Sequence, residues 1–215
     1  MALSPQVRSV DYVAHQRLLD QIQKKRPAHI VTSVGRLTEQ KMALLLKLNE
    51  NKVTALETLL QQLENRGLLL LLGSGDTELE KQCELIAARY PQLIFMNQYS
   101  VALSDLLFTN GNLFLMPSSF EPCGISQMLA MKEGQPCLAH AVGGLADTIV
   151  DDADGFLFKA SSFNAQMLAL TDRFQQVLSL REKQPDQYLH IATTARGKRF
   201  EWRTSAARYH SELYA

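Results

Sequence analysis

The sequence predicts a doubly wound α/β fold, in which a parallel sheet carries helices on both faces. Short apolar runs alternate along the chain with longer stretches whose apolar side chains recur at helical spacing. The runs are apolar at consecutive positions, as in residues 68–72, which is typical of parallel strands buried on both faces. The length of 215 residues, with 46% hydrophobic and 20% charged side chains, suits one medium globular domain with a sizeable core.

The individual elements follow from this alternation in chain order. The apolar runs predict strands at residues 29–34, 68–72, 92–96, 112–116, 136–140 and 155–158. The intervening stretches predict helices at residues 39–65, 76–90, 100–109, 124–133, 162–181, 186–196 and 202–213. The first of these helices has a leucine face that would pack on the sheet, and we expect it to break near residues 49–51.

The two ends of the chain differ from its centre. Residues 1–27 are polar and basic, with a helical pattern through Val13, Leu18, Leu19 and Ile22. Pro27 would stop such a helix. We therefore expect a linker or N-terminal helix at residues 1–27, the α/β domain at 28–199 and a C-terminal helix at 200–215.

Composition excludes several classes of partner. The 22 basic and 22 acidic side chains cancel, which indicates neither a nucleic-acid footprint nor a polybasic membrane anchor. Three widely spaced cysteines without a Cys-x-x-Cys pair indicate neither a disulfide framework nor a zinc site. The N-terminus lacks an apolar signal core, and the longest apolar run is far shorter than the roughly 20 residues of a membrane helix. We expect a soluble, cytoplasmic protein with no nucleic acid and no membrane as partner.

The loops that follow parallel strands meet at the carboxyl edge of a sheet, where such folds bind ligands. After the first strand, Gly35 permits a tight turn, and Arg36 and Lys41 lie where the amides and dipole of a helix start favour an anion. This loop predicts a pyrophosphate clamp. A helix capped by Thr38, with two solvated cations, explains the same residues about equally well.

The loop after the second strand, Gly73-Ser74-Gly75-Asp76, is a weaker signal. A Gly-x-Gly turn can bring backbone close to a ligand, but the complete dinucleotide fingerprint is absent. A turn with an aspartate helix cap is the better interpretation.

The loop after the fourth strand, residues 117–124, is stiffened by two prolines. Glu121 lies between these prolines, and a ligand contact explains it better than a helix cap. Gly124 lets the backbone approach a ligand, and amides from Cys123 onward can point at a sugar or phosphate. Cys123 itself is better explained as a small packing residue than as a nucleophile, because no basic residue is adjacent.

The loop after the fifth strand contains His140 and the pair Gly143-Gly144. Two consecutive glycines before a helical start predict a nest whose amides hold a phosphate oxygen, and a simple turn is the competing explanation. His140 could contact phosphate or sugar, although a lone histidine at a strand end is more often structural.

Together the four loops place two cations, one carboxylate and three glycine-rich surfaces at one predicted edge. That combination fits a diphosphate linked to a polyhydroxyl group. None of the four loops contains an Asp-x-Asp pair or a histidine cluster, so we expect no metal and no cofactor. Arg36, Lys41 and backbone dipoles would balance the diphosphate charge.

These motifs resemble those of bacterial glycogen synthases and plant starch synthases, which are retaining glucosyltransferases with the two-domain GT-B fold. The resemblance extends from about Ile30 to Tyr214 and implies the Rossmann-like C-terminal, nucleotide-sugar-binding domain of such an enzyme. Its specific stretches are residues 35–41, 72–76, 114–124, 143–148, 200–202 and 205–209. It implies transfer of glucose from ADP-glucose, or less favourably UDP-glucose, to an α-1,4-glucan acceptor.

The resemblance also implies residue roles. Arg36 and Lys41 correspond to the pair that neutralises the leaving diphosphate, Glu121 to the carboxylate at the donor glucose, and Tyr99 to an adenine-stacking side chain. The implied catalytic residues are Glu121, Arg36 and Lys41. The implied donor-binding residues are Tyr99 and the pair Gly143-Gly144, which corresponds to the turn beside the distal phosphate. The loops themselves add Cys123, Gly124, Ile125 and His140 as candidate donor-binding residues.

The sequence departs from the family pattern at several positions, which are Met42, Asn112, Ser119, His140 and Val142. It also contains no Lys-x-Gly-Gly loop, which belongs to the N-terminal domain of complete enzymes. We therefore expect a donor-binding domain that is inactive without its N-terminal GT-B partner domain. The alternative is a stand-alone, non-catalytic module that binds a nucleotide sugar or a glucan.

Overall fold

The structure is a computed structural model that describes residues 14, 16–17, 20 and 26–214. Most of the helical pattern predicted before Pro27, including Val13, Leu18, Leu19 and Ile22, lies outside the described residues. Among the helices of the described part, none combines the length and the apolar character that a membrane crossing requires.

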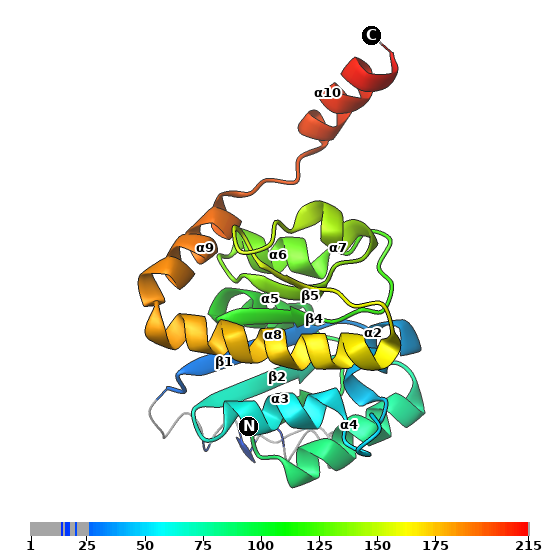
Figure 1. The fold of residues 1–215 in the computed structure, drawn as a ribbon, viewed down its shortest axis with the longest axis vertical. Coiled ribbons are helices and arrows are strands. Elements are labelled where there is room, and N and C mark those ends of the chain that lie inside the picture. Colours follow the sequence, from blue (N-terminus) through cyan, green and yellow to red (C-terminus); the bar gives the residue numbers. More distant parts are fainter. Residues whose placement is uncertain (1–13, 15, 18–19, 21–25, 215) are drawn as a thin grey trace.

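A six-stranded parallel sheet forms the centre of the molecule, in the order β3-β2-β1-β4-β5-β6 (Figure 1). The strands are β1 (His29–Val34), β2 (Gly67–Leu72), β3 (Leu93–Met96), β4 (Leu113–Met116), β5 (Cys137–His140) and β6 (Phe156–Phe158). Their registers pair Val31 with Leu69 and with Leu113 on the two sides of β1. Every boundary lies within one residue of the prediction, because continuous apolar runs mark doubly buried strands clearly.

Helices cover both faces of this sheet, which confirms the doubly wound fold. They are α2 (Glu39–Leu46), α3 (Ala55–Leu63), α4 (Thr77–Arg89), α5 (Val101–Asn110), α6 (Ser126–Lys132), α7 (Gly143–Thr148), α8 (Phe163–Lys183), α9 (Pro185–Gly197) and α10 (Trp202–Leu213). One apolar cluster joins one face of the sheet to α2, α3, α4 and α8. Two others join the opposite face to α5, α6 and α7 (Figure 1).

Two helical predictions need correction. The stretch 39–65 is two helices, α2 and α3; the expected break near 49–51 is present, but it extends over residues 47–54. Thr54 starts α3 with a capping box, in which its hydroxyl accepts from the Glu57 amide and Glu57 accepts from the Thr54 amide. The helix α7 was not predicted as an element, because it has only six residues and begins with two glycines.

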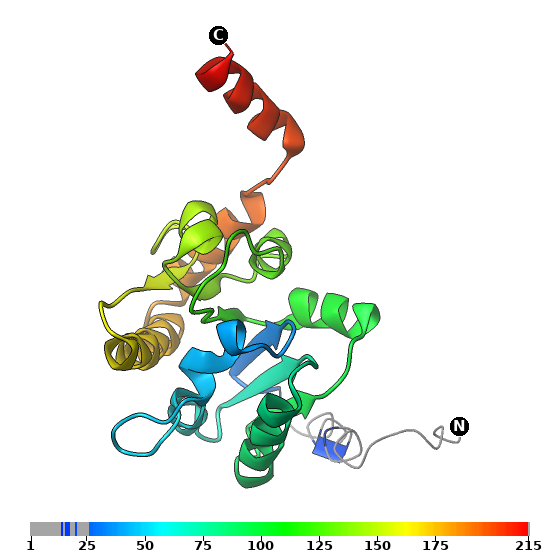
Figure 2. The same ribbon diagram turned by 90° about the vertical axis from the view of Figure 1, so that its right-hand side faces the viewer.

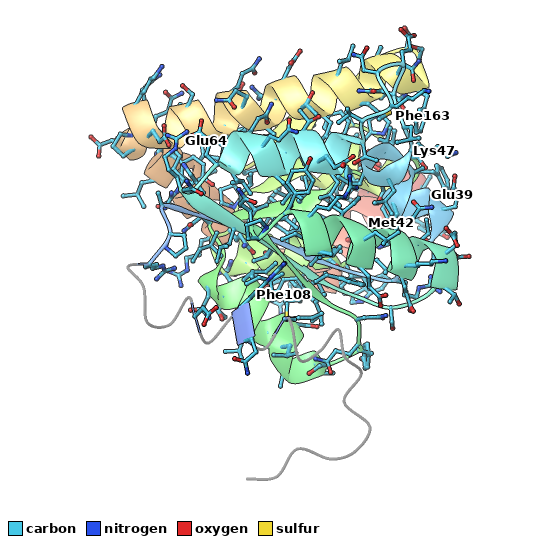
Figure 3. The ribbon with its side chains drawn as sticks, turned by 90° about the horizontal axis from the view of Figure 1, so that it is seen from below. Glu39, Met42, Lys47, Glu64, Phe108 and Phe163 are labelled. Atoms are coloured by element: carbon cyan, nitrogen blue, oxygen red, sulfur yellow. The ribbon has the colours of Figure 1, made fainter. Side chains whose placement is uncertain are left out.

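The end of α2 is attached to the start of α8 by a charged side chain. The ammonium of Lys47 lies 2.5 Å from a Glu39 carboxylate oxygen and 5.3 Å from the centre of the Phe163 ring (Figure 3). This contact helps to hold the short helix α2, whose first turn contributes to the candidate site.

The C-terminal helix α10 extends away from the rest of the molecule (Figures 1 and 2). None of its residues is buried, and Trp202 is 85% exposed. A monomeric domain rarely leaves a tryptophan so exposed on a helix that packs on nothing.

Candidate functional site

The strand order reverses direction between β1 and β4, and ligands of open α/β sheets bind at such a switch point. The loop of residues 35–41 follows β1 and leads into α2, and the loop of residues 117–124 follows β4. These two loops therefore lie side by side at the carboxyl edge of the sheet. A small pocket of about 20 Å³ between them is lined by Arg36, Lys41 and Ser118, among others. It holds about one water molecule.

The loop that carries Arg36 is supported from behind by the loop after β2. The Leu37 amide donates to the Ser74 carbonyl at 3.0 Å, and the Asp76 amide donates to the Leu37 carbonyl at 2.9 Å. A Cβ atom on Gly73 would lie 2.0 Å from the Gly35 carbonyl oxygen, which no side chain tolerates. The glycines after β2 thus permit close backbone packing against the Arg36 loop.

Asp76 also confirms the interpretation of the β2 loop as a helix start. Its side chain accepts hydrogen bonds from the amides of Glu78 and Leu79, at 2.9 and 3.2 Å, which caps α4. Thr38 occupies the same position before α2, but its side chain makes no capping hydrogen bond. The first-turn amides of α2 therefore lack the side-chain acceptor that Asp76 provides at α4.

Lys41 and Glu121 meet across the switch point. The Lys41 ammonium lies 3.4 Å from the Glu121 Oε2 atom, and the Ser118 hydroxyl donates to the same oxygen at 3.3 Å. The side chains of Lys41 and Glu121 are largely enclosed, at 23% and 10% exposed respectively. Arg36, in contrast, is exposed and has no hydrogen bond or ion pair among the described residues. The site thus holds a loosely paired lysine, a sheltered carboxylate and an unpaired guanidinium.

Gln40 joins the two loops, a contact that sequence reasoning missed. Its backbone carbonyl accepts from the Ser119 amide at 2.8 Å and from the Ser119 hydroxyl at 2.9 Å. Its side-chain amide donates to the Phe120 carbonyl at 2.6 Å. No local signal could have found this link, because a glutamine in a first helical turn has the pattern of any surface residue.

The Gly143-Gly144 turn packs on the backbone of the Glu121 loop. Gly143 has φ +44°, and Cβ atoms on Gly143 and Gly144 would lie 2.2 Å from the carbonyl oxygens of Glu121 and Cys123 respectively. The Gly144 amide donates to the Glu121 carbonyl at 2.9 Å. The close approach explains why both residues are glycine, and it engages the Gly144 amide with protein rather than leaving it free.

His140 lies beneath the same loop. Its side chain is buried and stacks on Phe158, with ring centres 5.0 Å apart. Its Nδ1 atom lies 3.1 Å from the Ser118 carbonyl oxygen, which can only accept, so Nδ1 carries a proton. Burial lowers the pKa of His140, opposed by the Ser118 hydrogen bond. A neutral His140 therefore supports Ser118, which in turn contacts Glu121.

The remaining predicted site residues lie at the same edge. Tyr99 follows β3 and is 85% exposed, and no hydrogen bond or ring contact within the described part of the chain joins it to Lys41 or Glu121. Cys123 is exposed, so the expectation of a packing residue there was wrong, and its thiol lies 3.5 Å from the Gly124 carbonyl oxygen. Gly124 has φ +75°, and Ile125 is 65% exposed at the start of α6. Within the described residues, no group of three or more His, Cys, Asp or Glu side chains could hold a metal ion.

Comparison with known proteins places this geometry in context. Residues 16–192 match the family described as glycosyl transferases group 1. The glycogen synthase of Aeromonas salmonicida (strain A449) is 34% identical over 218 residues, which cover 95% of this chain and 42% of that protein. The glycogen synthase of Aeromonas hydrophila subsp. hydrophila is 37% identical over 183 residues, which cover 82% of this chain and 35% of that protein.

A solved structure shows the same fold. The catalytic domain of starch synthase IV from Arabidopsis thaliana, bound to ADP and acarbose, superposes with a TM-score of 0.74 at 23% identity. The superposition covers 95% of this chain and 42% of that one. This chain thus spans about two fifths of the length of such relatives.

Proposed function

The chain belongs to the glycosyl transferases group 1 family, and from that premise we propose that it is the donor-binding, C-terminal domain of a glycogen or starch synthase-like retaining glucosyltransferase. The donor is ADP-glucose, with UDP-glucose as the less favoured alternative, and the acceptor is an α-1,4-glucan. The protein acts in the cytoplasm. The observation that carries this proposal is the approach of Lys41 to Glu121, at 3.4 Å, beside the unpaired Arg36 at the switch point.

The charges of the site suit a sugar diphosphate. Arg36 and Lys41 are positioned to neutralise the diphosphate as its bond to the sugar stretches, together with the first-turn amides of α2. This stabilisation grows as negative charge develops on the leaving group, so it accelerates the reaction rather than only binding the substrate. Glu121 accepts a hydrogen bond from a sugar hydroxyl, held in place by Ser118.

Tyr99, Cys123, Gly124, Ile125, His140, Gly143 and Gly144 complete the proposed donor site. Tyr99 stacks on the base of the nucleotide, and its ring is exposed and therefore free for this contact. The described contacts of His140 and Gly144 support a positioning role for these two residues, since both hold the loop that carries Glu121.

Transfer to the glucan also requires an N-terminal GT-B domain. The curated relatives are more than twice as long as the matched region, which leaves room for such a domain in them. The exposed Trp202 and Tyr209 on α10, 85% and 60% accessible, fit a helix that packs against a further domain.

Isothermal titration calorimetry on this chain tests the proposal. We expect binding of ADP and ADP-glucose, and weaker binding of UDP-glucose. Glu121→Ala should preserve ADP binding and remove the additional affinity that the glucose provides, whereas Glu121→Gln keeps a hydrogen-bond acceptor and should lose less. If the folded wild-type chain binds none of the three ligands, the proposed donor site is wrong.

A further inference from the structure

Gln127 is fully buried at the first turn of α6, directly beneath the loop that carries Glu121. Its side-chain amide donates toward the carbonyl oxygens of Cys123 and Gly124, at 3.1 and 3.0 Å. It also lies 3.3 Å from the hydroxyl oxygen of Thr148, at the end of α7. One side chain therefore joins two loops that the proposed function uses for the donor.

The hydrogen bonds continue from Thr148 back to Glu121. The Thr148 hydroxyl donates to the Gly144 carbonyl at 2.5 Å, and the Gly144 amide donates to the Glu121 carbonyl at 2.9 Å. These hydrogen bonds form a circuit through Gln127, Thr148, Gly144 and Glu121, which the covalent backbone of residues 121–124 closes. Buried hydrogen bonds of this kind restrict the backbone, because a rearrangement would break several of them at once. The Gln127 Oε1 atom is buried and has no hydrogen-bond partner among the described residues, so the amide is held through its Nε2 atom alone.

The Gln127 side chain packs so closely on Gly124 that neither residue can be larger. A Cβ atom on residue 124 would lie 2.4 Å from Gln127 Oε1 and 2.8 Å from Nε2. The glutamine amide therefore packs directly against the Gly124 backbone, which has φ +75°. Neither a longer side chain at 127 nor any side chain at 124 fits this contact.

We propose that Gln127 and Thr148 are positioning residues for the donor sugar: they set the Glu121 loop and the Gly143-Gly144 turn at a fixed distance from each other. This inference rests on the proposed function of the same site. The circuit does not include Arg36 or Lys41, and it engages the Gly144 amide with the Glu121 carbonyl rather than with a phosphate, so its loss affects the sugar end of the donor more than the diphosphate end.

Thr148→Val tests the circuit with the smallest change, since it removes one hydroxyl and keeps the shape. The lost hydroxyl donates to the Gly144 carbonyl and accepts from the Gln127 amide, and we expect its removal to raise the Kd for ADP-glucose at least about fivefold, since one hydrogen bond contributes about 1 kcal/mol. The Kd for ADP should change less than about twofold. Thr148→Ser restores the hydroxyl and should restore wild-type affinity for ADP-glucose.

Thr193→Val is the matched control. Thr193, on α9, makes the same hydrogen bond to the carbonyl four residues earlier, at 2.8 Å to Leu189, but its hydroxyl has no described link to Gln127 or to the site. Gln127→Glu keeps the shape of the side chain while removing both donors, and should raise the Kd for ADP-glucose at least as much as Thr148→Val. A melting curve for each variant establishes that it is folded.

The outcomes separate the two proposals. If the wild type binds neither ADP nor ADP-glucose, the proposed function fails. If the wild type binds ADP-glucose no more tightly than ADP, or if Thr148→Val changes both Kd values equally or neither, the positioning role of this circuit is wrong. An equal loss in Thr148→Ser and Thr148→Val would also contradict it.

Discussion

The two edges of the sheet treat their charged side chains in opposite ways. At the amino edge, Glu182 accepts from Arg66 at 2.6 Å and from the Nε2 atom of His29 at 2.8 Å. Arg181 donates to the Ala28 carbonyl and lies 3.3 Å from His29 Nδ1. At the carboxyl edge, Lys41 approaches Glu121 only to 3.4 Å and Arg36 has no partner among the described residues.

The molecule uses charge for stability at the amino edge and keeps it available at the carboxyl edge. Cations that already donate to carboxylates and carbonyls gain little from a new anion, because an existing hydrogen bond must break first. A cation that lacks such partners can donate fully to a ligand. The comparison therefore predicts that substitutions at the carboxyl edge affect binding, and that substitutions at the amino edge affect stability.

The largest expected effect is on diphosphate binding at the carboxyl edge. Arg36→Ala and Lys41→Ala should each weaken ADP binding about 10- to 100-fold, because hydrogen bonds to charged groups contribute about 1.5–3 kcal/mol. Arg36→Ala should leave the free energy of unfolding nearly unchanged, since Arg36 has no described partner to lose. Calorimetric titration with ADP and urea unfolding of the same samples measure both quantities.

Arg208→Ala provides the control for that experiment. Arg208 is an exposed cation on α10, paired with Glu212 at 3.2 Å, and its removal should alter neither quantity by much. If Arg36→Ala binds ADP as tightly as the wild type, Arg36 is not part of the ADP site. The proposed contrast between the two edges would then lack its unpaired cation.

Sequence and structure agree best where a pattern has one physical cause. Apolar runs of strand length that alternate with helical stretches are typical of buried parallel strands, so the carboxyl edge and its four loops were placed correctly. The side-chain links across that edge were not found, because Gln40, Gln127 and Ser118 make contacts that depend on the distance between loops. The sequence indicated that the glycines at residues 143 and 144 form a turn at the site. The reason why both must be glycine, close packing on the carbonyls of residues 121 and 123, is visible only in three dimensions.

The next effect in size is a loss of stability at the amino edge. Glu182→Ala leaves His29 and Arg66 without their shared acceptor, which should lower the free energy of unfolding by about 1–3 kcal/mol. ADP affinity should stay the same, because this cluster lies at the opposite edge from Lys41. Urea unfolding gives the first quantity and calorimetry the second.

Glu212→Ala is the matched carboxylate control. Glu212 pairs with Arg208 across one helical turn on the exposed α10, a type of pair that contributes about 0.3–0.5 kcal/mol. A loss in Glu182→Ala no larger than in Glu212→Ala would show that the amino-edge cluster is not a source of stability.

The smallest expected effect is the pH dependence of stability, and its sign follows from the two buried histidines. Burial lowers the pKa of His29 from its usual 6.5, and the charges of Arg181 and Arg66 lower it further against the opposing Glu182. The unfolded chain therefore takes up more protons than the folded chain below about pH 6.5, so stability is full above that pH and falls as the pH decreases toward the folded pKa. His140, whose pKa burial also lowers, contributes with the same sign.

Urea unfolding between about pH 5.5 and 7.5 should show this loss of stability, and both His29→Gln and His140→Gln should flatten the pH dependence. His190→Gln, at an exposed position on α9, should leave the curve as it is. Stability that increases on acidification across this range would contradict the assignment of neutral histidines to both edges.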